Sequence, residues 1–148
     1  MSTFQFSTDR MTRIASLLAS ITVCCGCGGG KPWDSVQAVT GVVTYKGNPV
    51  KDADLAFFPL DSEFPESVRP WAKSKENGEF VLSTYNNGDG APSGRYKVTV
   101  VHHEVTLSRD TLTTKPNDLP KKYASPETTD LTIEVKNGET KLEPFDLK

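Results

Sequence analysis

Short runs of apolar residues, separated by turn residues, make up most of the chain after residue 36. In residues 95–102, Tyr96, Val98 and Val100 alternate with Arg95, Lys97 and Thr99. This period of two is typical of a strand with one buried face and one face in water. No segment after residue 35 has the period of 3.6 residues that indicates an amphipathic helix. The pattern therefore predicts an all-β fold, with the first set facing the core and the second facing water.

The pattern predicts seven strands, at about residues 37–45, 53–59, 71–76, 79–84, 95–102, 131–136 and 142–147. The second of these runs is apolar on both faces, which favours a central strand. Asn77-Gly78 predicts a hairpin between the third and fourth strands, because both residues tolerate positive φ. Short strands separated by turns in a chain of this length predict an antiparallel β-sandwich.

The longest interruption between predicted strands is residues 104–128, which are polar and contain Pro116, Pro120 and Pro126. Long loops inside a compact domain are uncommon and are often functional. We expect an excursion without regular structure here, in which a turn at residues 119–124 lays Tyr123 on the sheet.

Residues 1–26 have the features of a targeting segment. Arg10 and Arg13 precede an apolar run at residues 14–23, which is too short to span a bilayer. The chain has three Cys, all at positions 24–27, so the folded part contains no disulfide. A plain secretory signal and a short buried helix are the alternatives for this segment.

The cysteine cluster resembles the lipobox of bacterial lipoproteins, in which a Cys becomes the lipid-modified first residue after cleavage. Gly26 supplies the small residue that this pattern requires before Cys27, whereas Cys24 and Cys25 are preceded by less suitable residues. Cys24 stands three positions before Cys27, where Leu is usual. The resemblance implies lipidation at Cys27, a signal peptide at residues 1–26 and a flexible tether at residues 27–36.

Three kinds of partner are not expected, namely nucleic acid, a cofactor and a metal ion. The formal net charge of -2 gives no reason to expect nucleic acid. No phosphate loop, Gly-x-Ser-x-Gly motif or zinc-ligand spacing is present, so we expect no cofactor. His102 and His103 are the only histidines, and adjacent residues of a strand point to opposite faces. If the strand instead ends at Val101, both imidazoles lie in a loop. We expect neither to hold a metal, since zinc usually takes three or four protein ligands.

Several segments resemble the carboxypeptidase regulatory-like domain, namely residues 41–50, 53–59, 77–80 and 94–100. This resemblance implies a seven-stranded transthyretin-like (prealbumin-like) sandwich over residues 37–148. Residues 119–128 and 131–135 are similar to small lipoproteins of this group in planctomycete-type bacteria. The shared motifs are turn glycines and strand residues, which indicate a fold rather than a function.

Enzymes on similar folds have motifs that this chain lacks. Hydroxyisourate hydrolases end in Tyr-Arg-Gly-Ser, whereas residues 145–148 read Phe-Asp-Leu-Lys. Intradiol dioxygenases bind iron with two Tyr and two closely spaced His, but here the two His are adjacent and the tyrosines are scattered. We therefore expect a protein that is not an enzyme.

The function that we expect is a membrane-anchored lipoprotein of the cell envelope, on the extracytoplasmic side, with a non-catalytic binding or structural module. Its membrane contact is Cys27, and its partner is an unidentified protein or glycan. The alternative is a subunit of an envelope complex that binds through residues 104–128 or through a sheet edge such as residues 71–76. Five aromatic side chains are available for contact, and we expect each of them to pack rather than to bind a ligand: Trp33, Phe64, Trp71, Tyr85 and Tyr123.

Overall fold

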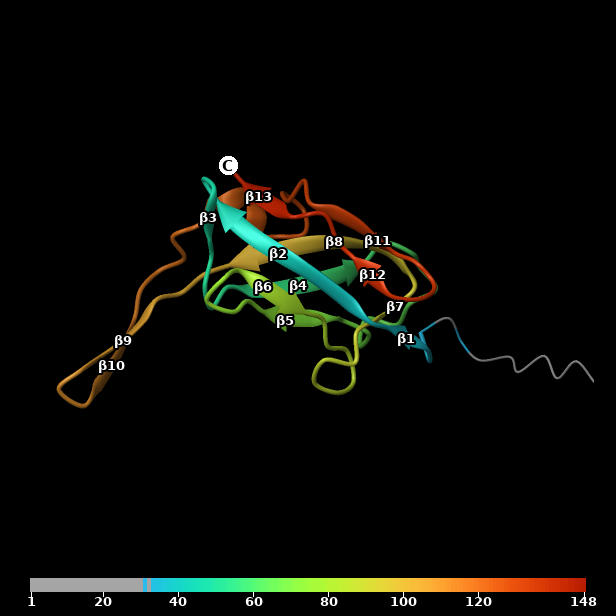
Figure 1. The fold of residues 1–148 in the computed structure, drawn as a ribbon, viewed down its shortest axis with the longest axis horizontal. Coiled ribbons are helices and arrows are strands. Elements are labelled where there is room, and N and C mark those ends of the chain that lie inside the picture. Colours follow the sequence, from blue (N-terminus) through green and yellow to red (C-terminus); the bar gives the residue numbers. More distant parts are fainter. Residues whose placement is uncertain (1–30, 32) are drawn as a thin grey trace, which may run out of the picture.

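A computed structural model of the chain describes residues 31 and 33–148, so the predicted signal segment and Cys27 lie outside the described residues. The fold is all-β apart from one 3-10 turn, η1 (Lys121–Ala124). Two sheets pack face to face around a single core (Figure 1). All strand pairings and all core side chains lie within residues 36–147, so this segment contains the whole sandwich. No helix among the described residues has the length and apolar character needed to cross a membrane.

The first sheet has the order β11-β8-β4-β5, and all of its neighbours are antiparallel. Its strands are β4 (Asp54–Pro59), β5 (Trp71–Lys73), β8 (Gly94–Val101) and β11 (Thr132–Val135). β4 lies between β8 and β5, which confirms the central strand predicted at residues 53–59.

The second sheet is built on β2 (Val39–Tyr45). Its antiparallel neighbours are β3 (Asn48–Pro49) and β6 (Glu79–Val81), and its parallel neighbours on the other edge are β12 (Thr140–Lys141) and β13 (Phe145–Leu147). The prediction of a wholly antiparallel sandwich is therefore wrong at the last strands. The chain crosses from β11 in the first sheet before it reaches β12, so no hairpin sets the direction of these strands.

Two short ladders lie outside the main sheets. β1 (Val36–Gln37) pairs with β7 (Ala91–Pro92), and β9 (Val105–Ser108) pairs with β10 (Thr111–Thr114). Trp33 lies three residues before the start of β1, and its carbonyl oxygen accepts a hydrogen bond from the Tyr85 hydroxyl at 2.7 Å. The Trp33 and Phe64 ring centroids are 6.0 Å apart, so residues 33–36 of the predicted tether are held against the domain.

The core contains the side chains that alternation placed inward. Phe57, Tyr96, Val98 and Phe80 are at most 1% exposed. Thr99, which we expected to face water, is only 7% exposed. Its hydroxyl donates to the Ala56 carbonyl oxygen on the neighbouring strand at 3.4 Å, so the polar group is satisfied within the sheet.

A hairpin closes one side of the sandwich. The Trp71 and Ser83 main chains exchange two hydrogen bonds of 2.9 Å, and the Lys75 N–H donates to the Glu79 carbonyl oxygen at 2.8 Å. The turn predicted at Asn77-Gly78 is confirmed, with Gly78 at φ 78°. The hairpin passes from β5 in the first sheet to β6 in the second. The edge of residues 71–76, which we expected to be open to a partner, is therefore occupied by residues 79–83.

Candidate functional site: a groove at the open side of the sandwich

The opposite side of the sandwich is open between β11 of the first sheet and β12–β13 of the second. Near the end of β13 the side chain of Tyr123 is buried, and its hydroxyl oxygen accepts a hydrogen bond from the Lys148 N–H at 3.1 Å. Tyr123 thus packs in the core, as the sequence predicts. The opening is a groove of about 730 Å³, lined by residues 130–134, 136, 137 and 139–145.

The floor of the groove is apolar. Leu131 and Ile133 are half-buried hydrophobic side chains that pack against the core from the β11 side. Leu142 and Phe145, from the facing sheet, are 8% and 7% exposed. A segment lying in the groove would remove the remaining apolar surface of these side chains from water, which is favourable.

The main chain of β11 offers hydrogen-bonding groups to the groove. The Val98 N–H donates to the Leu131 carbonyl oxygen at 3.0 Å, and the register continues with Ile133 opposite Tyr96. Because antiparallel ladders bond through alternate residues, Thr132 and Glu134 direct their N–H and C=O groups away from β8. Within the part of the chain that the structure describes, no other strand pairs with this edge. It is an open strand edge of the kind that accepts an added strand.

The facing wall has the same character. The Thr140 N–H donates to the Ala38 carbonyl oxygen, and the Leu142 N–H donates to the Thr40 carbonyl oxygen, both at 2.8 Å. The main-chain groups of Lys141, between these two residues, therefore face away from β2. The Thr140 hydroxyl oxygen is buried and has no hydrogen-bond partner among the described residues.

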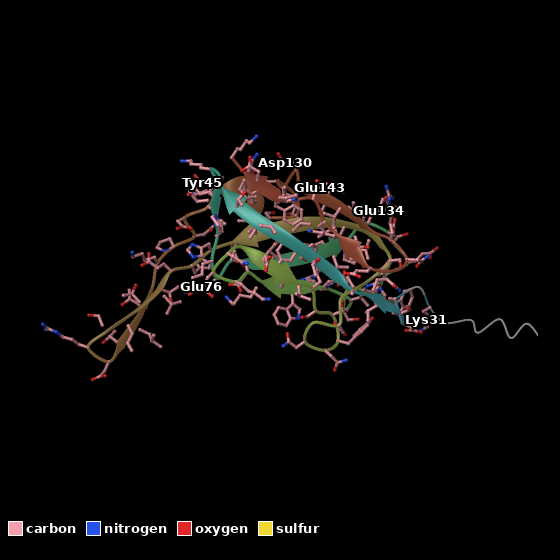
Figure 2. All side chains as sticks on the ribbon, viewed as in Figure 1. Lys31, Tyr45, Glu76, Asp130, Glu134 and Glu143 are labelled. Carbon is pink, nitrogen blue, oxygen red and sulfur yellow. The ribbon has the colours of Figure 1, made fainter. Side chains whose placement is uncertain are left out.

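The rim of the groove is mainly acidic. It carries the carboxylates of Asp130, Glu134, Glu139 and Glu143, against the ammonium groups of Lys136 and Lys141. Figure 2 shows three of these acids, Asp130, Glu143 and Glu134, along the same side of the molecule. Lys122 donates a hydrogen bond of 3.1 Å to Asp130 and lowers its pKa, which keeps that carboxylate ionised. The rim therefore favours a segment that brings positive charge.

The two histidines lie at the other end of β8. This strand ends at Val101, so both imidazoles follow it instead of occupying opposite faces of the sheet. His102 Nδ1 lies 2.8 Å from Asp118 Oδ1, whereas His103 Nδ1 lies 3.1 Å from the Lys115 carbonyl oxygen. The two rings thus engage different partners. Among residues 31 and 33–148, no group of three or more His, Cys, Asp or Glu side chains is placed to hold a metal ion.

The structure separates the candidate aromatic residues into two groups. Tyr123 is buried, and Trp33 and Phe64 are half-buried against each other, as expected for packing side chains. Trp71 and Tyr85 are 49% and 53% exposed. The hydroxyl of Tyr85 is bound to the domain, so the expectation of packing is wrong chiefly for Trp71, whose indole faces water at the β5–β6 hairpin.

Residues 104–115 form a projecting β-hairpin, which we call the arm (Figure 1). The sequence predicted no regular structure here. Its turn uses Arg109 and Asp110 at φ 43° and 65°, without the Gly or Asn that signals such a turn, so the hairpin was missed. The alternation of apolar residues with Thr and Ser was the remaining signal. Val105, Leu107 and Leu112 are 60%, 67% and 70% exposed, and Leu107 lies directly opposite Leu112.

Comparisons with known proteins leave the family open. No family model matches the chain, and no curated protein matches it. One similar solved structure is a 9R-lipoxygenase from Cyanothece PCC8801, with 13% identity and a TM-score of 0.39. The similarity covers 77% of this chain and 17% of the lipoxygenase. Another is a protein from Pseudomonas aeruginosa proposed to bind carbohydrate, with 12% identity and a TM-score of 0.43, covering 76% of this chain and 88% of that protein.

Proposed function

We propose that the chain is a lipid-anchored, non-catalytic binding module of the cell envelope, located on the extracytoplasmic side. The anchor is supported by the basic and apolar segment that precedes Cys27, with Gly26 before that Cys. A lipid-modified Cys with two or more acyl chains would keep the domain on a membrane. The resemblance to carboxypeptidase regulatory-like domains further supports a seven-stranded, transthyretin-like plan for the sandwich.

The binding site in this proposal is the groove, and the observation that carries it is the open edge of β11 beside an apolar floor. Its ligand is an extended polypeptide segment of an envelope partner. Such a segment adds to the edge of a sheet through main-chain hydrogen bonds, while alternate side chains supply specificity. Apolar side chains would face Leu131 and Ile133, and basic side chains would meet the acidic rim.

The anchor is tested by mass spectrometry and membrane fractionation of the protein from its native host. The N-terminal residue of the mature protein should be an acylated Cys27, and Cys27→Ser should move the domain from the membrane to the soluble fraction. Cys24→Ser is the matched control and should leave the protein on the membrane. An unmodified N-terminus, or a mature N-terminus at another residue, contradicts the anchor.

The groove is tested by photo-cross-linking. The chain has no Cys after Cys27, so Glu134→Cys in the soluble chain of residues 28–148 provides a single thiol for a benzophenone label. When this protein is added to solubilised envelope and illuminated, a cross-linked polypeptide should form and should be competed by unlabelled protein. The same label at Lys73→Cys, on β5, is the control and should give no such product. Equal labelling from both positions would contradict binding in the groove.

A further inference from the structure

We propose that the groove receives the arm of a second copy of this chain, so that the protein assembles head to tail. This inference rests on the proposed binding role of the groove and names its partner. The arm spans residues 104–115 and is joined to the body after Val101, at the end of β8.

The arm has the apolar pattern that the floor of the groove requires. Val105 and Leu107 alternate with Thr106 and Ser108, and each outer edge of the two-stranded ladder is unpaired in the part of the chain that the structure describes. Its three large apolar side chains, Val105, Leu107 and Leu112, are all more than half exposed, so their own domain does not cover them. An uncovered apolar face on a projecting element marks an interaction surface.

An arm strand that adds to β11 would satisfy both partners at once. Its main chain would bond to the outward N–H and C=O groups of Thr132 and Glu134. The period of two then turns Val105 and Leu107 toward the floor and Thr106 and Ser108 toward water. The apolar surfaces of the arm and of the floor, each of which is partly in water in the single chain, would cover each other.

The charges are compatible with this arrangement. At the base of the arm, Lys115 Nζ lies 2.7 Å from Glu104 Oε2, so these two charges already neutralise each other. The tip brings Arg109 and Asp110. The rim of the groove offers carboxylates for the first and the ammonium groups of Lys136 and Lys141 for the second. Neither tip charge would be left without a partner of opposite sign.

The geometry excludes filling of the groove by the arm of the same chain. β11 pairs with residues 94–97 of β8, whereas the arm leaves the body after the last residue of that strand. β8 has eight residues, which span roughly 25 Å. Figure 1 shows the arm projecting from one end of the molecule, away from β11 and β12. The contact therefore joins two copies, and when it repeats head to tail it gives a closed ring or an open filament.

The test uses one variant for each half of the contact. Leu107→Asp places a charge on the exposed apolar face of the arm. Thr132→Pro removes an N–H that points away from β8, a position where an edge strand tolerates proline. In sedimentation of residues 28–148, the mass of the wild-type protein should rise with concentration beyond that of a dimer. Each variant alone should remain a monomer. An equimolar mixture should form one-to-one dimers and nothing larger, because each such pair retains one intact arm and one intact groove.

The controls and the contrary outcomes are distinct. Leu60→Asp, at an apolar side chain that is 43% exposed elsewhere, and Thr132→Val should both assemble like the wild-type protein. Association of Thr132→Pro by itself would replace the proposal with an arm-to-arm contact. A wild-type protein that stays monomeric at the highest concentration overturns it. If the benzophenone at Glu134→Cys attaches to another envelope protein and never to arm peptides, the proposed function stands and this inference fails.

Discussion

Phe80 lies directly across from Gly41 on the neighbouring strand, with its ring over the glycine. The ring centroid is 5.8 Å from that of Phe145 in the same sheet and 6.3 Å from that of Phe57 in the opposite sheet. The missing side chain at Gly41 makes room for this cluster, which joins the two sheets at the centre of the core. A Cβ at position 41 would overlap the Phe80 ring.

Gly41→Ala should therefore destabilise the domain by about 1–3 kcal/mol, as overpacking of a core does. Urea denaturation measures the free energy of unfolding. Val42→Ala, a half-buried neighbour on the other face of β2, is the control and should cost less. In the double variant Gly41→Ala/Phe80→Leu the smaller side chain at position 80 should relieve the overlap. The double variant should therefore lose less unfolding free energy than the two single variants lose together. Strict additivity would show that the ring and the glycine are not coupled.

Phe57 is fully buried, whereas its neighbour Phe58 is half-buried on the outer face of the same strand. Phe57→Ala should cost about 3–5 kcal/mol of unfolding free energy, because it removes a large side chain and leaves a cavity. Phe58→Ala should cost less, although it also removes the contact of the ring with Arg69, whose guanidinium carbon lies 4.5 Å from the ring centroid. Equal costs in denaturation experiments would mean that the inner face of β4 is wrongly assigned.

Asp89 holds a loop through main-chain amides. Its carboxylate accepts hydrogen bonds from the N–H groups of Thr84, Tyr85 and Asn86 at 2.7, 3.0 and 2.8 Å. Partial burial raises the pKa of Asp89, but the amide donors outweigh it and the net pKa lies below the ordinary 3.8. A lowered pKa in the folded state means that this stabilisation is complete above 3.8 and is lost as the pH falls through the lower value.

We therefore expect Asp89→Asn to cost about 1 kcal/mol at neutral pH, a modest value for a partly exposed group. The difference in unfolding free energy between the variant and the wild-type protein should shrink as the pH is lowered from 4 toward 2. Chemical denaturation at several pH values measures it. A difference that does not change with pH would assign the effect to lost packing rather than to the charge.

The two histidines should not form a tight metal site, since their Nδ1 atoms face Asp118 and a carbonyl oxygen on separate segments. Calorimetric titration of residues 28–148 with zinc and with ferrous iron should show no stoichiometric sub-micromolar binding. His102→Ala should give the same titration curves as the wild-type protein. Tight binding that disappears in this variant would reopen the question of catalysis.

The sequence predicted the structure best where the order of side chains within a single strand or turn determines it. The alternation around Val98, the apolar run that includes Phe57 and the Asn77-Gly78 turn each depend on local side chains. Each is confirmed, except that Thr99 is buried instead of facing water. The parallel pairing of β13 was not predictable from its residues, because direction depends on the route between sheets. The arm was missed because its turn places Arg109 at positive φ, a conformation that Arg rarely adopts, and has no Gly or Asn as a signal.

The groove was not predictable for a related reason. The alternation in residues 131–136 predicts a strand with Ile133 facing inward. The structure confirms both the strand and the inward side chain. Whether that strand has one neighbour or two depends on which segments lie beside it in space. The expected open edge, residues 71–76, is occupied by a hairpin partner, and the open edge belongs to β11 instead. An open edge is a property of the assembled sheets.

The parallel pairing of β2 with β13 also has a consequence for the order of folding. Val43 lies opposite Phe145, and Tyr45 lies opposite Leu147, so β2 pairs with a strand about 100 residues later in the chain. Contacts between such distant residues form slowly, because a long loop must close before they contribute. The second sheet therefore stays incomplete until residues 145–147 have left the ribosome or a translocation channel. If the chain is exported as proposed, β2 would reach the far side of the membrane well before the strand that pairs with it in parallel.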